Sequence, residues 1–235
     1  MHVVPCDNYE RLSAQAAARV TAEVERKRDL LLCPATGSSP TGLYRELATR
    51  AASDADLFRS LRVIALDEWG GLKATDPGST TGYLKERLLG PLGISTDRFT
   101  AWDTDVNAST ACGRMQDQLA RLGPIDVCIL GLGINGHIGF NEPGPAMMPH
   151  CHIAYLSEET LRHAMAREMK QPPDVGLTLG ISEILAARYI LLLVTGEGKA
   201  QVAARLLGGE VTTALPASFL WLHANVDCLV DQALL

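Results

Sequence analysis

The chain lacks several features that would assign it quickly to a protein class. Its six cysteines are scattered without a CxxC pair, which disfavours a disulfide framework or a zinc ribbon. No apolar segment approaches the ~20 residues needed to span a bilayer. The first residues also do not form a charged region followed by a long apolar stretch. We therefore expect reduced cysteines and a cytoplasmic protein that does not bind membranes.

An excess of positive charge is also missing. The net charge of −6 disfavours the broad electrostatic attraction that nucleic-acid backbones require. We expect no nucleic-acid partner, and any bound phosphate should be small and locally held. With 47% hydrophobic and 20% charged residues, the chain can bury a full core. Residues 1–235 are therefore predicted to form a single domain.

Helical and strand-like patterns alternate along the chain. Leu12, Ala16, Val20 and Val24 recur at helical spacing after a capping Asp7 or Asn8. Further helices are predicted at residues 42–52, 83–89, 109–121 and 199–207. Strands are predicted at residues 30–33, 61–66, 126–130, 189–194 and 218–222. This alternation predicts an α/β fold, a three-layer αβα domain whose Rossmann-like sheet is largely parallel and has helices on both faces.

The most informative segment is residues 131–144, GLGINGHIGFNEPG, directly after a predicted strand. Its glycines allow the backbone to approach a ligand closely. His137 and Glu142 then lie just beyond the carboxyl end of the strand, where open α/β sheets place their ligand crevices. A histidine oriented by a carboxylate is an acid/base pair at neutral pH. The alternative is a glycine-rich turn with a surface histidine and a helix-capping Asn141.

A second strand end leads into a small, hydroxylic loop. Residues 34–42 include Thr36, Gly37, Ser38 and Ser39 and open a predicted helix. Free N–H groups and the positive end of the helix dipole can hold a phosphate there. The loop lacks the Gly-Lys-Ser/Thr ending of a Walker A motif, and a simple helix cap is the alternative.

Two more strand ends carry charged residues. Asp67 and Glu68 follow one predicted strand, and burial could raise the pKa of one carboxyl enough for it to act as a base. Lys199 stands at another helix entrance, where it suits a substrate phosphate. A pair of solvated acids and an ordinary surface charge are the alternatives. Taken together, the four loops favour a sugar-phosphate pocket.

Four motifs in this order resemble the glucosamine-6-phosphate deaminase family over nearly the whole chain. They are ATGSSP at 35–40, LDEW at 66–69, residues 131–144, and TGEGK at 195–199. Within the family, Trp69, Asn135 and the ALPASFLWLH stretch at 214–223 look most like the galactosamine-6-phosphate isomerase branch. The segment after the Gly-His pair differs from that of the related 6-phosphogluconolactonases.

The resemblance implies a reaction and roles for individual residues. The family opens the ring of an amino-sugar 6-phosphate, transfers a proton from C2 to C1 through an enolamine, and releases ammonia without a metal or organic cofactor. The family's base matches Asp67, and its ring-opening group matches His137 with Glu142 as orienting carboxylate. Phosphate binding falls to residues 36–39 and Lys199. A small-molecule substrate is thus the expected partner, and a homo-oligomer is left open.

Two departures from the glucosamine enzymes stand out. They carry an aspartate at the position of Asn135, so this chain lacks a charge that supports the histidine. Their phosphate-binding lid arginine has only Arg167 as a candidate here, within residues 143–173, a segment bounded by prolines and predicted to be a lid.

The predicted activity is conversion of galactosamine 6-phosphate to tagatose 6-phosphate and ammonia. The alternatives are deamination of glucosamine 6-phosphate to fructose 6-phosphate, or lactone hydrolysis as in the 6-phosphogluconolactonases. A sugar-phosphate sensor of a transcription regulator would need a basic DNA-binding segment, which the sequence lacks. His150 and His152 have no partner at zinc-site spacing, so no metal is expected.

Overall fold

The computed structural model describes residues 1–162, 164–167, 169 and 173–235. Its central sheet has seven strands in the order β1-β10-β9-β6-β2-β3-β5, and every neighbouring pair is parallel. The strands are β1 (His2–Cys6), β2 (Leu31–Cys33), β3 (Arg62–Ile64), β5 (Phe99–Thr100), β6 (Val127–Gly131), β9 (Tyr189–Val194) and β10 (Val226–Asp231). All six residues of β9 are buried, as expected for a strand covered on both faces.

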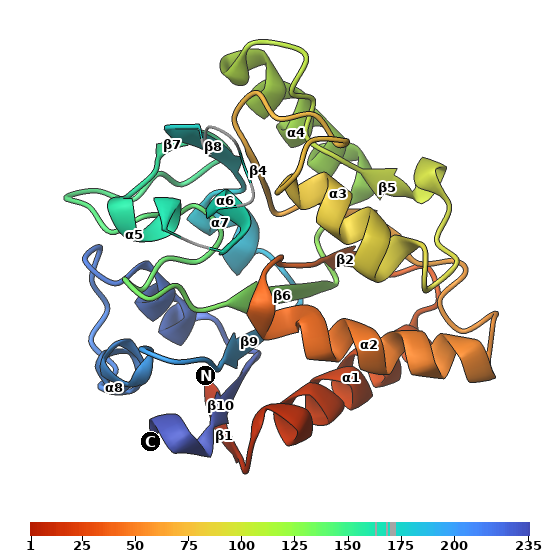
Figure 1. Cartoon of the computed structure of the whole chain (residues 1–235), viewed down its shortest axis with the longest axis horizontal. Helices are drawn as coiled ribbons and strands as arrows, with labels where there is room; N and C mark the ends of the chain where they lie inside the picture. Colours follow the sequence, from red (N-terminus) through yellow and green to blue (C-terminus); the bar gives the residue numbers. More distant parts are fainter. Residues whose placement is uncertain (163, 168, 170–172) are drawn as a thin grey trace.

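Helices flank the sheet, which confirms the predicted α/β architecture (Figure 1). They are α1 (Tyr9–Arg26), α2 (Ser38–Ser53), α3 (Thr80–Leu84), α4 (Ala108–Leu122), α5 (Glu158–Leu161), α6 (Ala164–Arg167), α7 (Ile181–Leu185) and α8 (Ala200–Leu207). A π-helical turn, η1 (Lys85–Leu89), continues α3, and short 3₁₀ helices are η2 (Thr96–Arg98), η3 (Pro216–Leu222) and η4 (Gln232–Leu234). Figure 1 shows α1 and α2 side by side and the two chain ends close together beside the paired strands β1 and β10.

The first helix forms as the sequence pattern predicts. The Asn8 side chain accepts a hydrogen bond from the N–H of Arg11 and caps α1. The four apolar residues at helical spacing, from Leu12 to Val24, are all buried in the main core. The amphipathic stripe therefore anchors α1 against its neighbours.

Strand order places a crevice between β2 and β6. From β2 the chain continues to β3 and β5 on one side, whereas β6, β9, β10 and β1 lie on the other. Cys33 pairs with Cys128 across this boundary. The loops after β2 and β6 run away from each other at such a switch point and leave room for a ligand at the carboxyl ends of the strands.

A second sheet of three antiparallel strands, β4-β8-β7, was not predicted. It consists of β4 (Asp67–Trp69), β7 (His152–Tyr155) and β8 (Val175–Thr178). The expectation that Asp67 and Glu68 follow a strand is therefore corrected. The strand β3 ends at Ile64, and both acids lie inside β4 itself. Residues 143–173 contribute β7, α5 and α6.

The predicted strand at 218–222 is wrong. These residues belong to η3, which has Pro216 in its first turn, and Trp221 donates its indole N–H to the carbonyl of Leu206. The last strand is instead β10, which was not predicted. Two more strands of the central sheet, β1 and β5, were also not predicted. The strand β1 contains Pro5 and lies at the sheet edge, where a residue without an N–H is tolerated.

Candidate functional site

The four polar loops meet at a cavity of about 550 Å³. Of the residues predicted to be catalytic or to bind phosphate, those that line it are Thr36, Gly37, Ser38, Ser39, Asp67, His137, Arg167 and Lys199. They follow or belong to β2, β4, β6 and β9, and Arg167 comes from α6. The fold thus brings together residues that are up to 163 positions apart, between Thr36 and Lys199. Asn135 and Glu142 lie behind His137, outside this lining.

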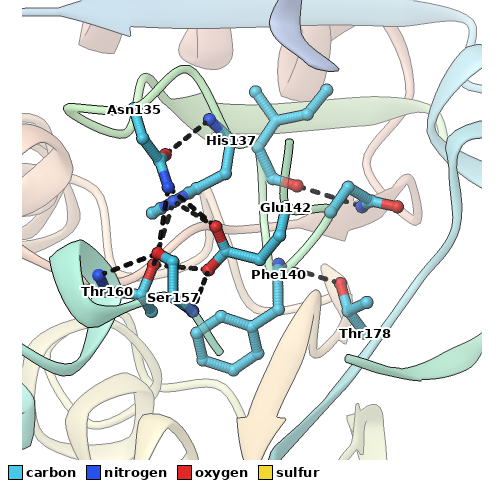
Figure 2. A network of polar contacts seen from close by, with 9 residues as sticks. Asn135, His137, Phe140, Glu142, Ser157, Thr160 and Thr178 are labelled. Carbon is cyan, nitrogen blue, oxygen red and sulfur yellow. Dashed lines mark hydrogen bonds and ion pairs between the residues drawn. The ribbon is translucent and has the colours of Figure 1, made fainter. Parts of the chain in front are cut away.

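A polar cluster surrounds the Glu142 carboxylate (Figure 2). Its Oε2 accepts from Asn135 Nδ2 at 2.8 Å, and its Oε1 accepts from the Thr160 hydroxyl at 2.5 Å. Burial favours the neutral acid, but the adjacent His137 and the hydrogen bonds from Thr160 and Asn135 outweigh it and hold the pKa of Glu142 at about 2. Glu142 is therefore ionised at neutral pH.

The Asn135 side chain supports the loop rather than the imidazole. Its Oδ1 accepts from the backbone N–H of His137 at 3.1 Å, while its Nδ2 donates to Glu142 and to Ser157 Oγ. The amide therefore shapes the turn and also orients the carboxylate. None of the described hydrogen bonds joins it to the ring of His137.

The imidazole of His137 lies flat over Gly133. A Cβ added at Gly133 would be 2.6 Å from three ring atoms, far inside contact distance. The same glycine donates its N–H to the carbonyl of His137 at 2.9 Å. This position of the ring therefore requires a residue without a side chain at position 133.

Asp67 is buried, with 7% exposure, yet it lines the cavity. None of the described residues donates a hydrogen bond to its side chain. Burial raises the pKa of Asp67 to about 7, and the negative charge of Glu68 adds to the shift. A carboxylate with these properties can accept a proton at neutral pH.

The neighbouring Glu68 has a different environment. Its Oε1 accepts from the N–H groups of Trp69 and Thr80, both at 2.9 Å. Its Oε2 accepts from the Thr81 N–H at 2.8 Å and the Ser79 hydroxyl at 3.2 Å. The carboxylate thus caps the start of α3 and is not available as a base.

Thr36, Gly37, Ser38 and Ser39 lead into the sixteen-residue helix α2. Gly37 is its N-cap with φ of 98°, a backbone angle that favours glycine. Lys199, the N-cap of α8, points its Nζ to within 3.3 Å of Ser39 Oγ. Burial lowers the pKa of Lys199 to about 8, so the amine still carries a proton at pH 7. These groups suit a small phosphate dianion.

Several residues that line the cavity had no predicted catalytic or phosphate-binding role. Trp69 packs on Phe140 with ring centroids 4.8 Å apart, and Gly176 opposite Trp69 leaves room for the Phe140 ring. Thr160 and Arg162 come from α5 and the residue after it. Sequence spacing could not reveal Thr160 and Arg162, since they reach the cavity from a segment with irregular composition.

The segment 214–223, which looks like the galactosamine branch, buttresses the glycine-rich loop. Ala217 donates its N–H to the carbonyl of Gly136 at 3.0 Å. Leu215 packs so closely that a Cβ on Gly136 would be 2.3 Å from its side chain. The branch-like segment therefore touches the loop that carries His137.

Other polar residues have structural partners. Asn141 caps no described helix, contrary to the alternative weighed above; its Nδ2 donates to the carbonyls of Ile138 and Leu179. His150 Nδ1 lies 2.9 Å from Glu183, and His152 Nδ1 lies 2.8 Å from the carbonyl of His150. Within the described residues, no three His, Cys, Asp or Glu side chains cluster as metal ligands. None of the described helices is long and apolar enough to cross a bilayer.

Residues 7–229 match the model of the glucosamine-6-phosphate isomerases/6-phosphogluconolactonase family. The chain belongs to this family. A relative in Bacillus velezensis, a glucosamine-6-phosphate deaminase, is 39% identical over 99% of this chain and 98% of its own length. AgaI of Escherichia coli (strain K12) is 40% identical over 96% of this chain and 90% of its own length. Its deaminase activity is inferred.

Solved structures of the family share the fold. A monomeric glucosamine-6-phosphate deaminase superposes with a TM-score of 0.94 at 35% identity, covering 100% of this chain and 98% of that one. The 6-phosphogluconolactonase of Trypanosoma brucei reaches 0.76 at 23% identity, covering 99% and 97%, and shows only the common fold. The chain therefore groups with the amino-sugar-phosphate deaminases of the family.

Proposed function

We propose that the chain deaminates and isomerises an amino-sugar 6-phosphate, with galactosamine 6-phosphate as its preferred substrate. The observation that carries the proposal is Asp67, a buried carboxylate with a pKa of about 7 that faces the cavity shared with His137 and Lys199. A base matched to neutral pH, an imidazole and a phosphate-binding amine are what the reaction needs. The deaminase relatives support the same activity.

Each group has a role in this proposal. Lys199, residues 36–39 and Arg167 bind the 6-phosphate. As the ring C1–O5 bond breaks, His137 takes the proton of the O1 hydroxyl and passes it to the ring oxygen. Asp67 then removes the proton from C2 while O1 takes a proton from the substrate ammonium group, which gives an enolamine. Return of the C2 proton from Asp67 to C1 converts the enolamine to a C2 iminium. Water adds at C2 and ammonia leaves, giving the ketose 6-phosphate.

We further propose that residues 1–235 act as one domain in which 143–173 form a lid. The support is that Thr160, Arg162 and Arg167 of this segment line the cavity. A homo-oligomer stays a prediction, and the relative of known structure is described as monomeric.

The substrate prediction is tested by a side-by-side assay of ammonia release from both epimers. We expect turnover of galactosamine 6-phosphate without added metal and a lower kcat/KM with glucosamine 6-phosphate. The reason is the branch-like set of Trp69, which lines the cavity, and Asn135 and residues 214–223, which contact the loop that carries His137. Equal or better turnover of the gluco epimer would contradict the epimer assignment. Hydrolysis of 6-phosphogluconolactone with no ammonia from either epimer would contradict the deaminase.

The Asn135→Asp variant tests how Glu142 is supported. The change replaces the amide that donates to Glu142 at 2.8 Å with a second carboxylate. Two carboxylates at hydrogen-bond distance cannot both stay ionised without a large penalty, so the pKa of Glu142 should rise. The extra negative charge also favours a protonated His137. We expect a lower rate at pH 7 and an acidic limb of kcat/KM that moves to higher pH. A pH profile that overlays the parent would leave Asn135 as a turn residue only.

A further inference from the structure

The contact between His137 and Glu142 is indirect. The closest distance between His137 Nδ1 and the carboxylate is 3.7 Å, to Oε2, which is too long for a hydrogen bond. Thr160 Oγ1 lies between the two groups, 3.1 Å from Nδ1 and 2.5 Å from Glu142 Oε1. Figure 2 shows the threonine reaching the pair from α5. The expected orientation of His137 by Glu142 therefore runs through Thr160.

The direction of each hydrogen bond follows from counting protons. An ionised carboxylate only accepts, so the single hydroxyl proton of Thr160 goes to Glu142. The threonine oxygen is then an acceptor toward the imidazole, and Nδ1 must carry a proton to donate to it. In the neutral ring this leaves Nε2 without a proton.

The threonine is itself held firmly. Thr160 is 3% exposed, and its N–H donates to Oγ of Ser157, the N-cap of α5, at 3.2 Å. The Ser157 hydroxyl in turn donates to Thr160 Oγ1 at 3.2 Å and accepts from Asn135 at 3.0 Å. The cap of α5 and the glycine-rich loop thus locate one hydroxyl at the imidazole.

We propose that Thr160 is a positioning residue that holds neutral His137 in the tautomer with the proton on Nδ1, so that Nε2 is free to accept the O1 proton of the substrate. This inference rests on the proposed function. It also gives the 143–173 segment a role besides covering the cavity, because α5 then sets the protonation geometry of a residue on the opposite loop.

The test compares Thr160→Val, Thr160→Ser and Leu161→Val. Valine keeps the shape of threonine but cannot relay the hydrogen bond, while serine keeps the hydroxyl. Leu161 is the neighbouring α5 residue and packs against the apolar cluster that includes Trp69 and Phe140, so its variant reports on loosened packing alone. Nitrogen-15 NMR of the uniformly labelled free protein reads the tautomer, and a His137→Gln variant identifies the resonance.

We expect the Nδ1–H tautomer in the parent, in Thr160→Ser and in Leu161→Val, and loss of that preference in Thr160→Val. The kcat for ammonia release should fall roughly 10–10²-fold in Thr160→Val with little change in KM, as for other supporting hydrogen-bond partners. Serine should restore most of this loss.

An Nε2–H tautomer in the parent would overturn the inference, as would an unchanged tautomer and kcat in Thr160→Val. An equal loss of kcat in Leu161→Val would also overturn it, since packing would then explain the effect. Absence of ammonia release by the parent would contradict both the proposed function and the positioning role of Thr160. An Nε2–H tautomer in a fully active parent would contradict only the positioning role of Thr160.

Discussion

Asp67→Asn is expected to lower ammonia release by at least ~10²-fold, the usual cost of losing a general base. Asparagine keeps the shape of the side chain but cannot accept the C2 proton. Because the Asp67 side chain accepts no hydrogen bond from a described residue, the change should leave the cavity and the KM for substrate nearly intact. The measurement is kcat and KM by ammonia release across pH 5–9. In the parent, kcat/KM should fall below about pH 7, where the carboxylate takes up its proton.

The same variant should be more stable than the parent at alkaline pH. Folding raises the pKa of Asp67 from 3.8 to about 7, so the folded chain binds more protons than the unfolded chain between these values. The stability of the parent therefore falls as pH rises through that window, and the penalty is complete above it. Asparagine does not titrate, so the gain should be absent near pH 4 and reach on the order of 2–4 kcal/mol at pH 8. Urea unfolding at both pH values measures it.

Glu68→Gln is the matched contrast. The Glu68 carboxylate accepts from Trp69, Ser79, Thr80 and Thr81, and a glutamine would turn an amide donor toward some of these donors. We expect this variant to lose roughly 2–3 kcal/mol of unfolding free energy, typical of a broken buried charged hydrogen-bond network. If Asp67→Asn kept near-parent turnover, or was destabilised like Glu68→Gln, Asp67 would be a structural acid and not the base.

Gly133→Ala is expected to lower kcat by about 10²-fold or more, the scale of loss when a reacting group is misplaced by about 1 Å. The added methyl would lie 2.6 Å from three atoms of the His137 ring, so the ring or the loop must move. The shift would also break the 3.1 Å contact between His137 Nδ1 and Thr160. Steady-state kinetics and the His137 NMR resonance should change together.

Gly113→Ala provides the control. Gly113 lies inside α4, and a Cβ there would have nothing within 4 Å. Alanine suits a helix interior better than glycine by about 0.5–1 kcal/mol, so this variant should be slightly more stable and fully active. Parent-like kinetics in Gly133→Ala would show that the imidazole tolerates a displaced position and would weaken the case that His137 takes part in the reaction.

The sequence alone predicted the loops that form the site. Apolar runs identified the central strands, and the polar residues after 30–33, 126–130 and 189–194 converge because parallel strands end at the same edge of a sheet. The capping and spacing of α1 were equally readable, since they depend on residues close together in the chain. Apolar runs, helix caps and helical spacing depend on neighbouring residues, so they can be recognised without knowledge of the tertiary structure.

Other features depended on residues distant in sequence. The run at 218–222 reads as a strand, but the contact of Trp221 with Leu206 holds it in a 3₁₀ helix. Asp67 and Glu68 are adjacent acids, and only the family resemblance, not the residue pattern itself, distinguished them in the sequence. The donors at the start of α3 occupy Glu68, while Asp67 faces the cavity without a described donor.

The pair of His137 and Glu142 likewise combines features that the sequence reveals with features that only the tertiary structure decides. Sequence spacing alone indicated His137 and Glu142 as partners, because both lie in one glycine-rich loop. The hydroxyl that joins them belongs to Thr160, 18 residues beyond Glu142 in a segment without a regular pattern. Only folding of α5 against the loop brings this hydroxyl within hydrogen-bond distance of both the imidazole and the carboxylate. The residue types that can carry the chemistry are thus readable from the sequence, whereas burial and the hydrogen bonds that set each protonation state come from tertiary packing.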